Sequence, residues 1–121
     1  MSRAYSNDVT FEYPHLLVCA EQGAHSVVDL LLKRGADVNH RRNDGATALV
    51  DAATWGHDDC VQALLAAGAE VDIPHREGWT ALMIASQEGQ MGAVNMLLEA
   101  GADVHLKTEH GGAYSALSHA Y

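Results

Sequence analysis

Apolar residues in the middle of the chain form pairs of short segments with helical spacing, and polar stretches containing glycine separate the pairs. Thr47 and Thr80 each precede a segment rich in Ala and Leu, which predicts a first helix whose free N–H groups the threonine oxygen caps. Gly56 and Gly89 are predicted to end these first helices. A second helix is then predicted by apolar residues at helical spacing, namely Val61, Leu64 and Leu65 in one pair and Val94, Leu97 and Leu98 in the next.

The whole pattern returns at a fixed interval. Gly-Ala-Asp-Val-Asn recurs as Gly-Ala-Glu-Val-Asp and as Gly-Ala-Asp-Val-His, starting at 35, 68 and 101, which are steps of 33 residues. Gly-Ala-Thr-Ala-Leu at 45–49 matches Gly-Trp-Thr-Ala-Leu at 78–82 in the same register. Glycine just beyond the last apolar turn ends a helix in the left-handed conformation. The stretch from Val71 to Gly78 is short and polar, which predicts a turn-rich finger.

These landmarks together resemble the ankyrin repeat, whose period they share. The resemblance covers residues 14–121 and implies an all-α solenoid of stacked helix-turn-helix units with β-turn fingers. We expect an N-terminal extension at 1–13 and an N-terminal capping repeat without its finger at 14–39. Ankyrin repeats are expected at 40–72 and 73–105, and the start of a further, incomplete repeat at 106–121.

The two ends depart from this pattern. Pro14 stands where threonine would begin the first unit, and proline is tolerated in a first helical turn because its missing N–H would have no partner there. In the last unit Ser115 takes the threonine position only after a short insertion. The chain stops at Tyr121, within the first helix of that unit. Because repeats bury their apolar faces against their neighbours, we expect the chain to be a segment of a longer array.

The apolar positions that keep the repeat register predict the core. They are Leu16, Cys19, Ala20, Val28, Leu31 and Leu32 in the first unit, Leu49, Ala52, Val61, Leu64 and Leu65 in the second, and Leu82, Ala85, Val94, Leu97 and Leu98 in the third.

Charge narrows the possible partners. The 121 residues include 7 Lys and Arg against 16 Asp and Glu, a net charge of −9. Nucleic-acid binding draws its affinity from cations that displace counterions, so no nucleic-acid partner is expected, and an anionic membrane surface is disfavoured for the same reason. No apolar run approaches the roughly 20 residues that span a bilayer, and residues 1–13 contain no secretory signal. Cys19 and Cys60 form no CxxC pair, so we expect reduced thiols and an intracellular protein of the cytoplasm or nucleus.

The resemblance implies a non-catalytic module that recognises a partner protein through its fingers and concave face. Trp55 and Trp79 are the central candidates, because tryptophan is enriched at binding hot spots. The alternative is that Trp79 packs on Met83 or Trp55 and stiffens the finger. The full set of candidate partner-binding residues is Trp55, Trp79, Arg76, Glu77, Asn43, Asp44, Glu88, Lys107 and His110.

Four of the seven cations, Arg41, Arg42, Arg76 and Lys107, fall in the fingers. They could meet an acidic stripe on a partner, or they could be solvated finger tips.

The resemblance also marks Asn39, preceded by Leu31, as a possible target of an asparaginyl hydroxylase that acts on ankyrin repeats. Asp72 and His105 hold the same place in the next units and are weaker candidates. The alternative is that the Asn39 side chain bonds the backbone of the finger.

Catalysis and metal binding are not expected. The eight histidines lack the convergent Cys or His ligands of a closed zinc site, and the resemblance implies a structural role for His57. Cys60 lies on an apolar helical stripe, where cysteine is normally inert. Asp51 and His57 could be an acid–base pair, but the sequence shows no convergent nucleophile and pocket to complete a catalytic site. We therefore expect no cofactor and no small-molecule substrate. The alternative to a binding module is a structural spacer within a longer array, with no partner of its own.

Overall fold

The computed structural model describes residues 15–75 and 78–106. Within these residues the chain forms six helices and no strand. They are α2 (His15–Gln22), α3 (His25–Lys33), α4 (Ala48–Trp55), α5 (Asp58–Ala66), α6 (Ala81–Glu88) and α7 (Met91–Glu99). The all-helical prediction is confirmed. Pro14 and most of the expected last unit lie outside the described residues.

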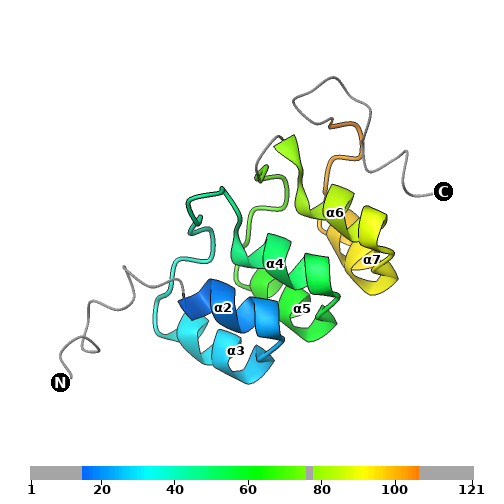
Figure 1. Ribbon diagram of the computed structural model, residues 1–121. Helices are drawn as coiled ribbons and strands as arrows, with labels where there is room; N and C mark the ends of the chain where they lie inside the picture. Colours follow the sequence, from blue (N-terminus) through cyan, green and yellow to red (C-terminus); the bar gives the residue numbers. More distant parts are fainter. Residues whose placement is uncertain (1–14, 76–77, 107–121) are drawn as a thin grey trace.

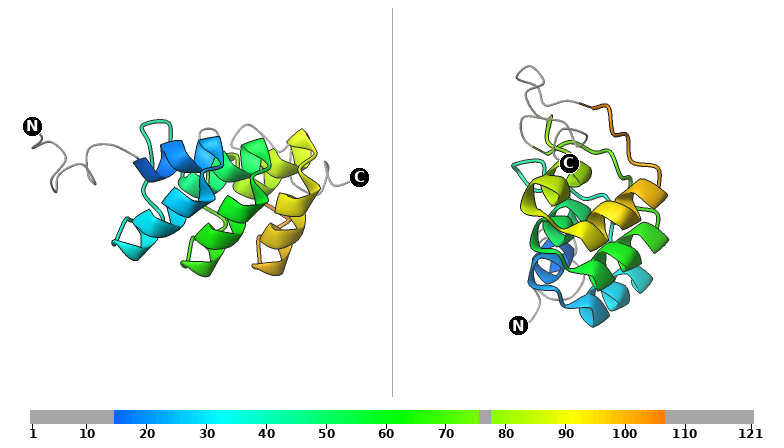
Figure 2. Two further views of the ribbon diagram at one scale, coloured as in Figure 1. Left: turned by 90° about the horizontal axis from the view of Figure 1, so that it is seen from below. Right: turned by 90° about the vertical axis from the view of Figure 1, so that its right-hand side faces the viewer.

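The helices form two rows (Figures 1 and 2). The first helices α2, α4 and α6 stack side by side in one row, and the second helices α3, α5 and α7 stack in the other. Each first helix also packs against the second helix that follows it in sequence. Long loops join one helix pair to the next and extend to one side of the stack (Figure 1).

Local sequence determines where the first helices begin and end. The Thr47 hydroxyl accepts a hydrogen bond from the Val50 amide at 3.3 Å, and the Thr80 hydroxyl does the same for Met83 at 3.3 Å. Both threonines are buried, so the caps predicted from the sequence are confirmed. Gly56 ends α4 with a left-handed φ of 71°, a conformation that a side chain would strain.

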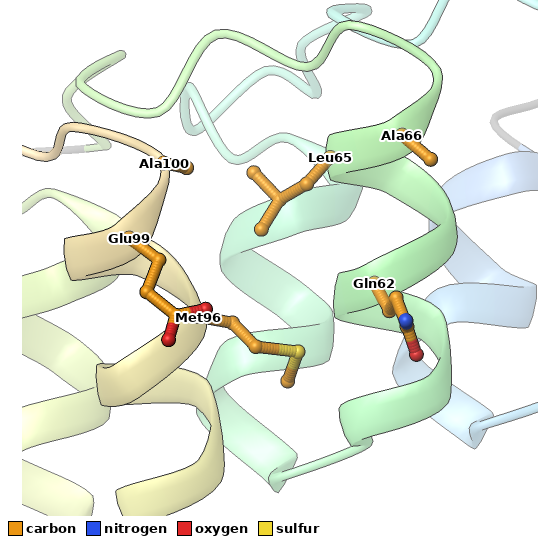
Figure 3. Close-up of a pocket in the computed structure, with 6 residues that line it drawn as sticks. All are labelled: Gln62, Leu65, Ala66, Met96, Glu99 and Ala100. Carbon is orange, nitrogen blue, oxygen red and sulfur yellow. The ribbon is translucent and has the colours of Figure 1, made fainter.

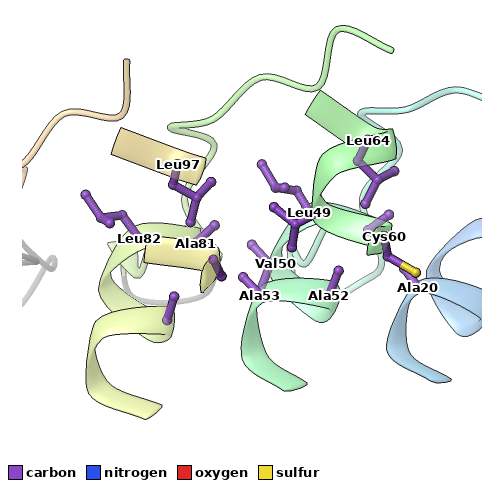
Figure 4. Packing of buried hydrophobic residues seen from close by; sticks show 14 of the residues in the cluster. Ala20, Leu49, Val50, Ala52, Ala53, Cys60, Leu64, Ala81, Leu82 and Leu97 are labelled. Carbon is purple, nitrogen blue, oxygen red and sulfur yellow. The ribbon is translucent and has the colours of Figure 1, made fainter. Parts of the chain in front are cut away.

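The core runs between the two rows (Figure 4). Leu49, Leu64, Leu82 and Leu97 are fully buried, and burying such a leucine stabilises the fold by about 1.5–3 kcal/mol. Alanines between neighbouring first helices, Ala52 among them, are also fully buried and keep the helices close.

Most of the predicted core is buried or half-buried. Val28, Val61, Val94, Leu16, Ala20 and Ala85 are buried, whereas Cys19, Leu31, Leu32 and Leu65 are half-buried against the core. Leu98 was wrongly assigned, because its side chain is 43% exposed. Its equivalent, Leu65, lies between α5 and α7, whereas α7 is the last helix of the described residues and has a neighbour on one side only.

Side chains also link consecutive repeats. The His57 ring Nε2 lies 2.9 Å from the Glu21 carbonyl oxygen near the end of α2. One repeat later, Gln90 stands in the place of His57, and its Nε2 donates to the Thr54 carbonyl at 3.1 Å. In both places a side chain just before a second helix binds a carbonyl near the end of the preceding first helix. His57 is therefore engaged in linking repeats.

Candidate functional site

The exposed surface of α2, α4 and α6 forms the first-helix face, which we define by Val18, Glu21, Gln22, Trp55, Gln87 and Glu88. Trp55 is the last residue of α4, and 57% of it is exposed. Gln22 and Glu88 hold the equivalent places on α2 and α6, 33 residues before and after Trp55. An exposed tryptophan therefore lies between two polar neighbours at one edge of this face.

Trp79 differs from Trp55. It is half-buried and packs against the core, although the predicted core did not include it. Trp79 directly precedes the buried cap Thr80, and the Trp79 carbonyl accepts a hydrogen bond from the His75 amide. These contacts agree with the alternative in which Trp79 stiffens the finger.

The second finger, residues 40–46 at the start of the second repeat, contacts α4 through an ion pair. Arg42 Nη1 lies 2.6 Å from Asp51 Oδ2, and Arg42 Nη2 lies 3.3 Å from Asp51 Oδ1. The same guanidinium donates to Asp44 at 3.4 Å. Asp51 is only 6% exposed, so its carboxylate depends on Arg42 for most of its compensation.

Neighbouring fingers are linked as well. The Arg41 Nε donates to the Gly45 carbonyl at 3.1 Å, and the Arg41 guanidinium also donates to the Pro74 carbonyl of the next finger. His75 Nε2 lies 3.7 Å from Asp44 Oδ2. Both described finger arginines thus bind groups of this chain. Arg76 and Lys107 lie outside the described residues, and the two expectations for the finger cations stay predictions.

The two carboxyls beside Arg42 have opposite electrostatic environments. Burial raises the pKa of Asp51 above its ordinary value, and Arg42 offsets only part of that effect. The hydrogen bond from the Ala46 amide, followed by the charge of Arg42, lowers the pKa of Asp44. The buried charge of Asp51 therefore destabilises the fold, and Arg42 reduces that cost. Asp44, in contrast, is stabilised in its charged form.

The other candidate residues are distributed as follows. Glu88 lies exposed on the first-helix face, Asn43 is exposed in the second finger, and Asp44 is half-buried there. The structure therefore does not gather all candidates into one compact site. Arg76, Glu77, Lys107 and His110 lie outside the described residues.

Asn39 joins two repeats. Its Oδ1 accepts a hydrogen bond from the Glu70 amide at 2.9 Å, and its own amide donates to Asp37 Oδ1 at 2.9 Å. Asp72 repeats the first contact by accepting from the Asp103 amide at 3.0 Å. The Asn39 side chain thus accepts a hydrogen bond from the backbone of the next repeat, not from that of its own finger. Its hydroxylation stays a prediction, which a mass increase of one oxygen atom on the Asn39 peptide of cell-derived protein would test.

The candidate catalytic and metal-binding residues do not converge in the described structure. Cys60 is fully buried, and burial raises the pKa of its thiol, which disfavours the reactive thiolate. Among residues 15–75 and 78–106, no three His, Cys, Asp or Glu side chains are grouped so that they could hold a metal ion. None of the helices in those residues is long and apolar enough to cross a membrane.

Sequence reasoning missed the Arg42–Asp51 pair. An acid on a predicted core helix, nine residues after an arginine, was the available signal for the pair.

A family model of ankyrin repeats in three copies matches residues 16–108 of the chain. The chain therefore belongs to the ankyrin repeat family. Ankyrin repeats are generally protein–protein interaction modules, and the family is generally non-enzymatic.

Two curated proteins share short stretches with the chain. It is 47% identical over 38 residues to the probable E3 ubiquitin-protein ligase XBOS32 of Oryza sativa subsp. japonica, a match that covers 31% of the chain and 8% of that protein. It is 48% identical over 42 residues to the ankyrin repeat and KH domain-containing protein mask of Drosophila melanogaster, covering 35% of the chain and 1% of that protein. The chain thus spans only a small part of either relative.

Proposed function

We propose that the chain is a non-catalytic module that binds a partner protein through its fingers and its first-helix face. The observation that carries this proposal is Trp55, which is 57% exposed at the end of α4. Tryptophan buries a large area on binding while few rotatable bonds are immobilised, and for this reason it dominates many interfaces. The described residues cover less than half of Trp55, so a bound partner can bury most of its remaining exposed surface.

The surroundings of Trp55 favour a partner with cations. Glu21 and Glu88 are exposed on the neighbouring first helices, and the described arginines of the second finger are engaged within the chain. A segment with an apolar group for Trp55 and basic residues beside it would complement this face. Asn43 offers an exposed amide in the second finger. Arg76, Glu77, Lys107 and His110 remain proposed contacts on sequence grounds alone.

The test is an affinity pull-down from cell lysate with quantitative mass spectrometry. Wild type is compared with Trp55→Ala and with the matched control Leu30→Ala, which removes a side chain exposed to a similar degree, 48%, on α3 in the other row. We expect one protein enriched by wild type and by Leu30→Ala and lost with Trp55→Ala. With that protein purified, Trp55→Ala should weaken binding by about 2 kcal/mol, close to thirtyfold.

The same experiment distinguishes a binding module from a structural spacer. Circular dichroism of each variant establishes that it is folded. If neither wild type nor control enriches any protein, the proposal fails and the spacer function is favoured. If Trp55→Ala retains the partner with unchanged affinity, binding occurs elsewhere on the chain.

A further inference from the structure

We propose that a groove between α5 and α7 binds a lysine side chain of a partner protein. The groove lies in the row of second helices and is separate from the first-helix face, so it is a second surface beyond the function proposed above. Its lining residues come from the C-terminal halves of the two helices and from Ala100 just after α7 (Figure 3): Gln62, Leu65, Ala66, Met96, Glu99 and Ala100. With a volume of about 370 Å³ it lies at the lower end of the range for ligand sites, roughly 300–1,000 Å³.

Two lining positions of the groove differ from their equivalents in the preceding repeat. Lys33 in the last turn of α3 and Ala66 of α5 are equivalent, since they lie 33 residues apart. Lys33 Nζ pairs with Asp29 on its own helix at 3.6 Å with its side chain 73% exposed, and Gln62 stands in the place of Asp29. Ala66 therefore places a methyl group at the groove where α3 has an exposed lysine.

The floor of the groove suits an alkyl chain. Leu65 and Met96 face each other across the groove (Figure 3), and both are half-buried against the core. The flanking alanines, Ala66 and Ala100, leave room above this floor. Lysine commonly buries its four-carbon stem along apolar surface while its ammonium group stays at the rim.

The rim is negative. Glu99 places its carboxylate beside Met96 (Figure 3), and the C-terminal ends of α5 and α7 add the partial negative charge of their aligned peptide dipoles. Neither helix has a basic residue in its last turn, whereas α3 has Lys33. An uncharged apolar side chain would fill the floor without compensating Glu99, and an acidic one would be repelled. A lysine satisfies both the floor and the rim.

The experiment is a titration of the full chain, carrying ¹³C-methyl methionine, with the acetyl methylamide of lysine. The chain contains 4 methionines. Met96 lines the groove, whereas Met83 is fully buried and Met91 is 64% exposed at the opposite end of α7, so these two are internal controls. We expect a saturable shift of the Met96 methyl signal with a dissociation constant of about 1 mM, and no such shift at Met83 or Met91.

Matched ligands and variants decide the chemistry. The norleucine amide, which lacks the ammonium group, should bind at least threefold more weakly, and Glu99→Gln should weaken lysine binding by about threefold. Ala66→Lys restores the side chain found at position 33 and should abolish the shift. Asn95→Lys makes the same charge change on the face of α7 equivalent to that of Gln62, away from the groove, and should bind within about twofold of wild type.

Several results would overturn the assignment. They are an unshifted Met96 signal, equal shifts at Met91 and Met96, equal binding of the norleucine amide, and wild-type binding by Ala66→Lys. Trp55→Ala should bind the lysine amide as wild type does. A failure at the groove is therefore distinguishable from a failure at the first-helix face.

Discussion

Removing the Arg42 side chain should destabilise the fold more than removing an ordinary surface side chain would. The variant Arg42→Ala leaves the Asp51 side chain, 9% exposed, without the guanidinium that binds both carboxylate oxygens at 2.6 and 3.3 Å. Removing one partner of a fully buried ion pair costs about 3–5 kcal/mol. Because the Arg42 side chain is itself 34% exposed, water can reach part of the vacated space, and we expect about 2–3 kcal/mol.

A second substitution should restore most of that loss. Val18 and Ile84 are the equivalents of Asp51 in the preceding and following repeats, so the double variant Arg42→Ala/Asp51→Ile installs an apolar residue that the same position accepts elsewhere. Replacing a buried ion pair with apolar side chains is often neutral. The double variant should therefore lie within about 1 kcal/mol of wild type.

The assay is urea unfolding followed by circular dichroism for wild type, both single variants and the double variant. For a folded unit of this size, a loss of 2–3 kcal/mol lowers Tm by roughly 10–20 °C, so thermal melts give a second measurement. The reasoning is refuted if Arg42→Ala costs less than about 0.5 kcal/mol, or if adding Asp51→Ile recovers nothing.

Four further predictions use the same unfolding assay. Since burial raises the folded-state pKa of Asp51, its contribution to stability is greatest at low pH and is lost as pH rises through that pKa. The stability of wild type relative to Asp51→Ile should therefore fall as pH rises above about 4, the ordinary aspartate pKa. Asp44, whose pKa is lowered, should act in the opposite sense, so the advantage of wild type over Asp44→Ala should disappear as pH falls below about 4, and a flat profile would contradict it. Thr80→Ala should cost about 1 kcal/mol through the lost cap, and an unchanged midpoint would argue against that cap. Leu64→Ala in the core should cost about 2–5 kcal/mol, whereas Leu98→Ala should cost less than about 1 kcal/mol, and similar costs would contradict the burial difference.

The helix pairs were predictable because their signals are local and occur twice. Thr47 and Thr80 cap their helices through their own backbone neighbours, and Gly56 ends α4 through its own φ. None of these features depends on a distant residue. A repeat also supplies its own confirmation, since a cap that recurs at the same interval is independent evidence for the same structure.

The errors arose where long side chains or neighbours decide the outcome. The 33-residue period predicts the place of a residue within its repeat, but not the direction of a long side chain. Arg42 was therefore assigned to the finger surface, although its side chain binds Asp51 on α4. Trp79 precedes a buried cap and turns toward the core. Leu98 follows the pattern of Leu65, but its burial requires a helix on the far side of α7, and the described residues contain none. The groove was missed because alanine at position 66 carries no signal of its own.

The ion pairs of the second finger change what the net charge implies about binding. Taken from the sequence, the finger arginines offered cations to an acidic partner while the rest of the chain repelled it. In the structure Arg42 binds both Asp51 and Asp44, and Arg41 binds carbonyl oxygens, so both arginines are engaged within the chain. Glu88 on the first-helix face and Glu99 at the groove are exposed, and neither forms an ion pair within residues 15–75 and 78–106. Both surfaces therefore favour the same sign of partner, and raising the salt concentration should weaken binding at each of them.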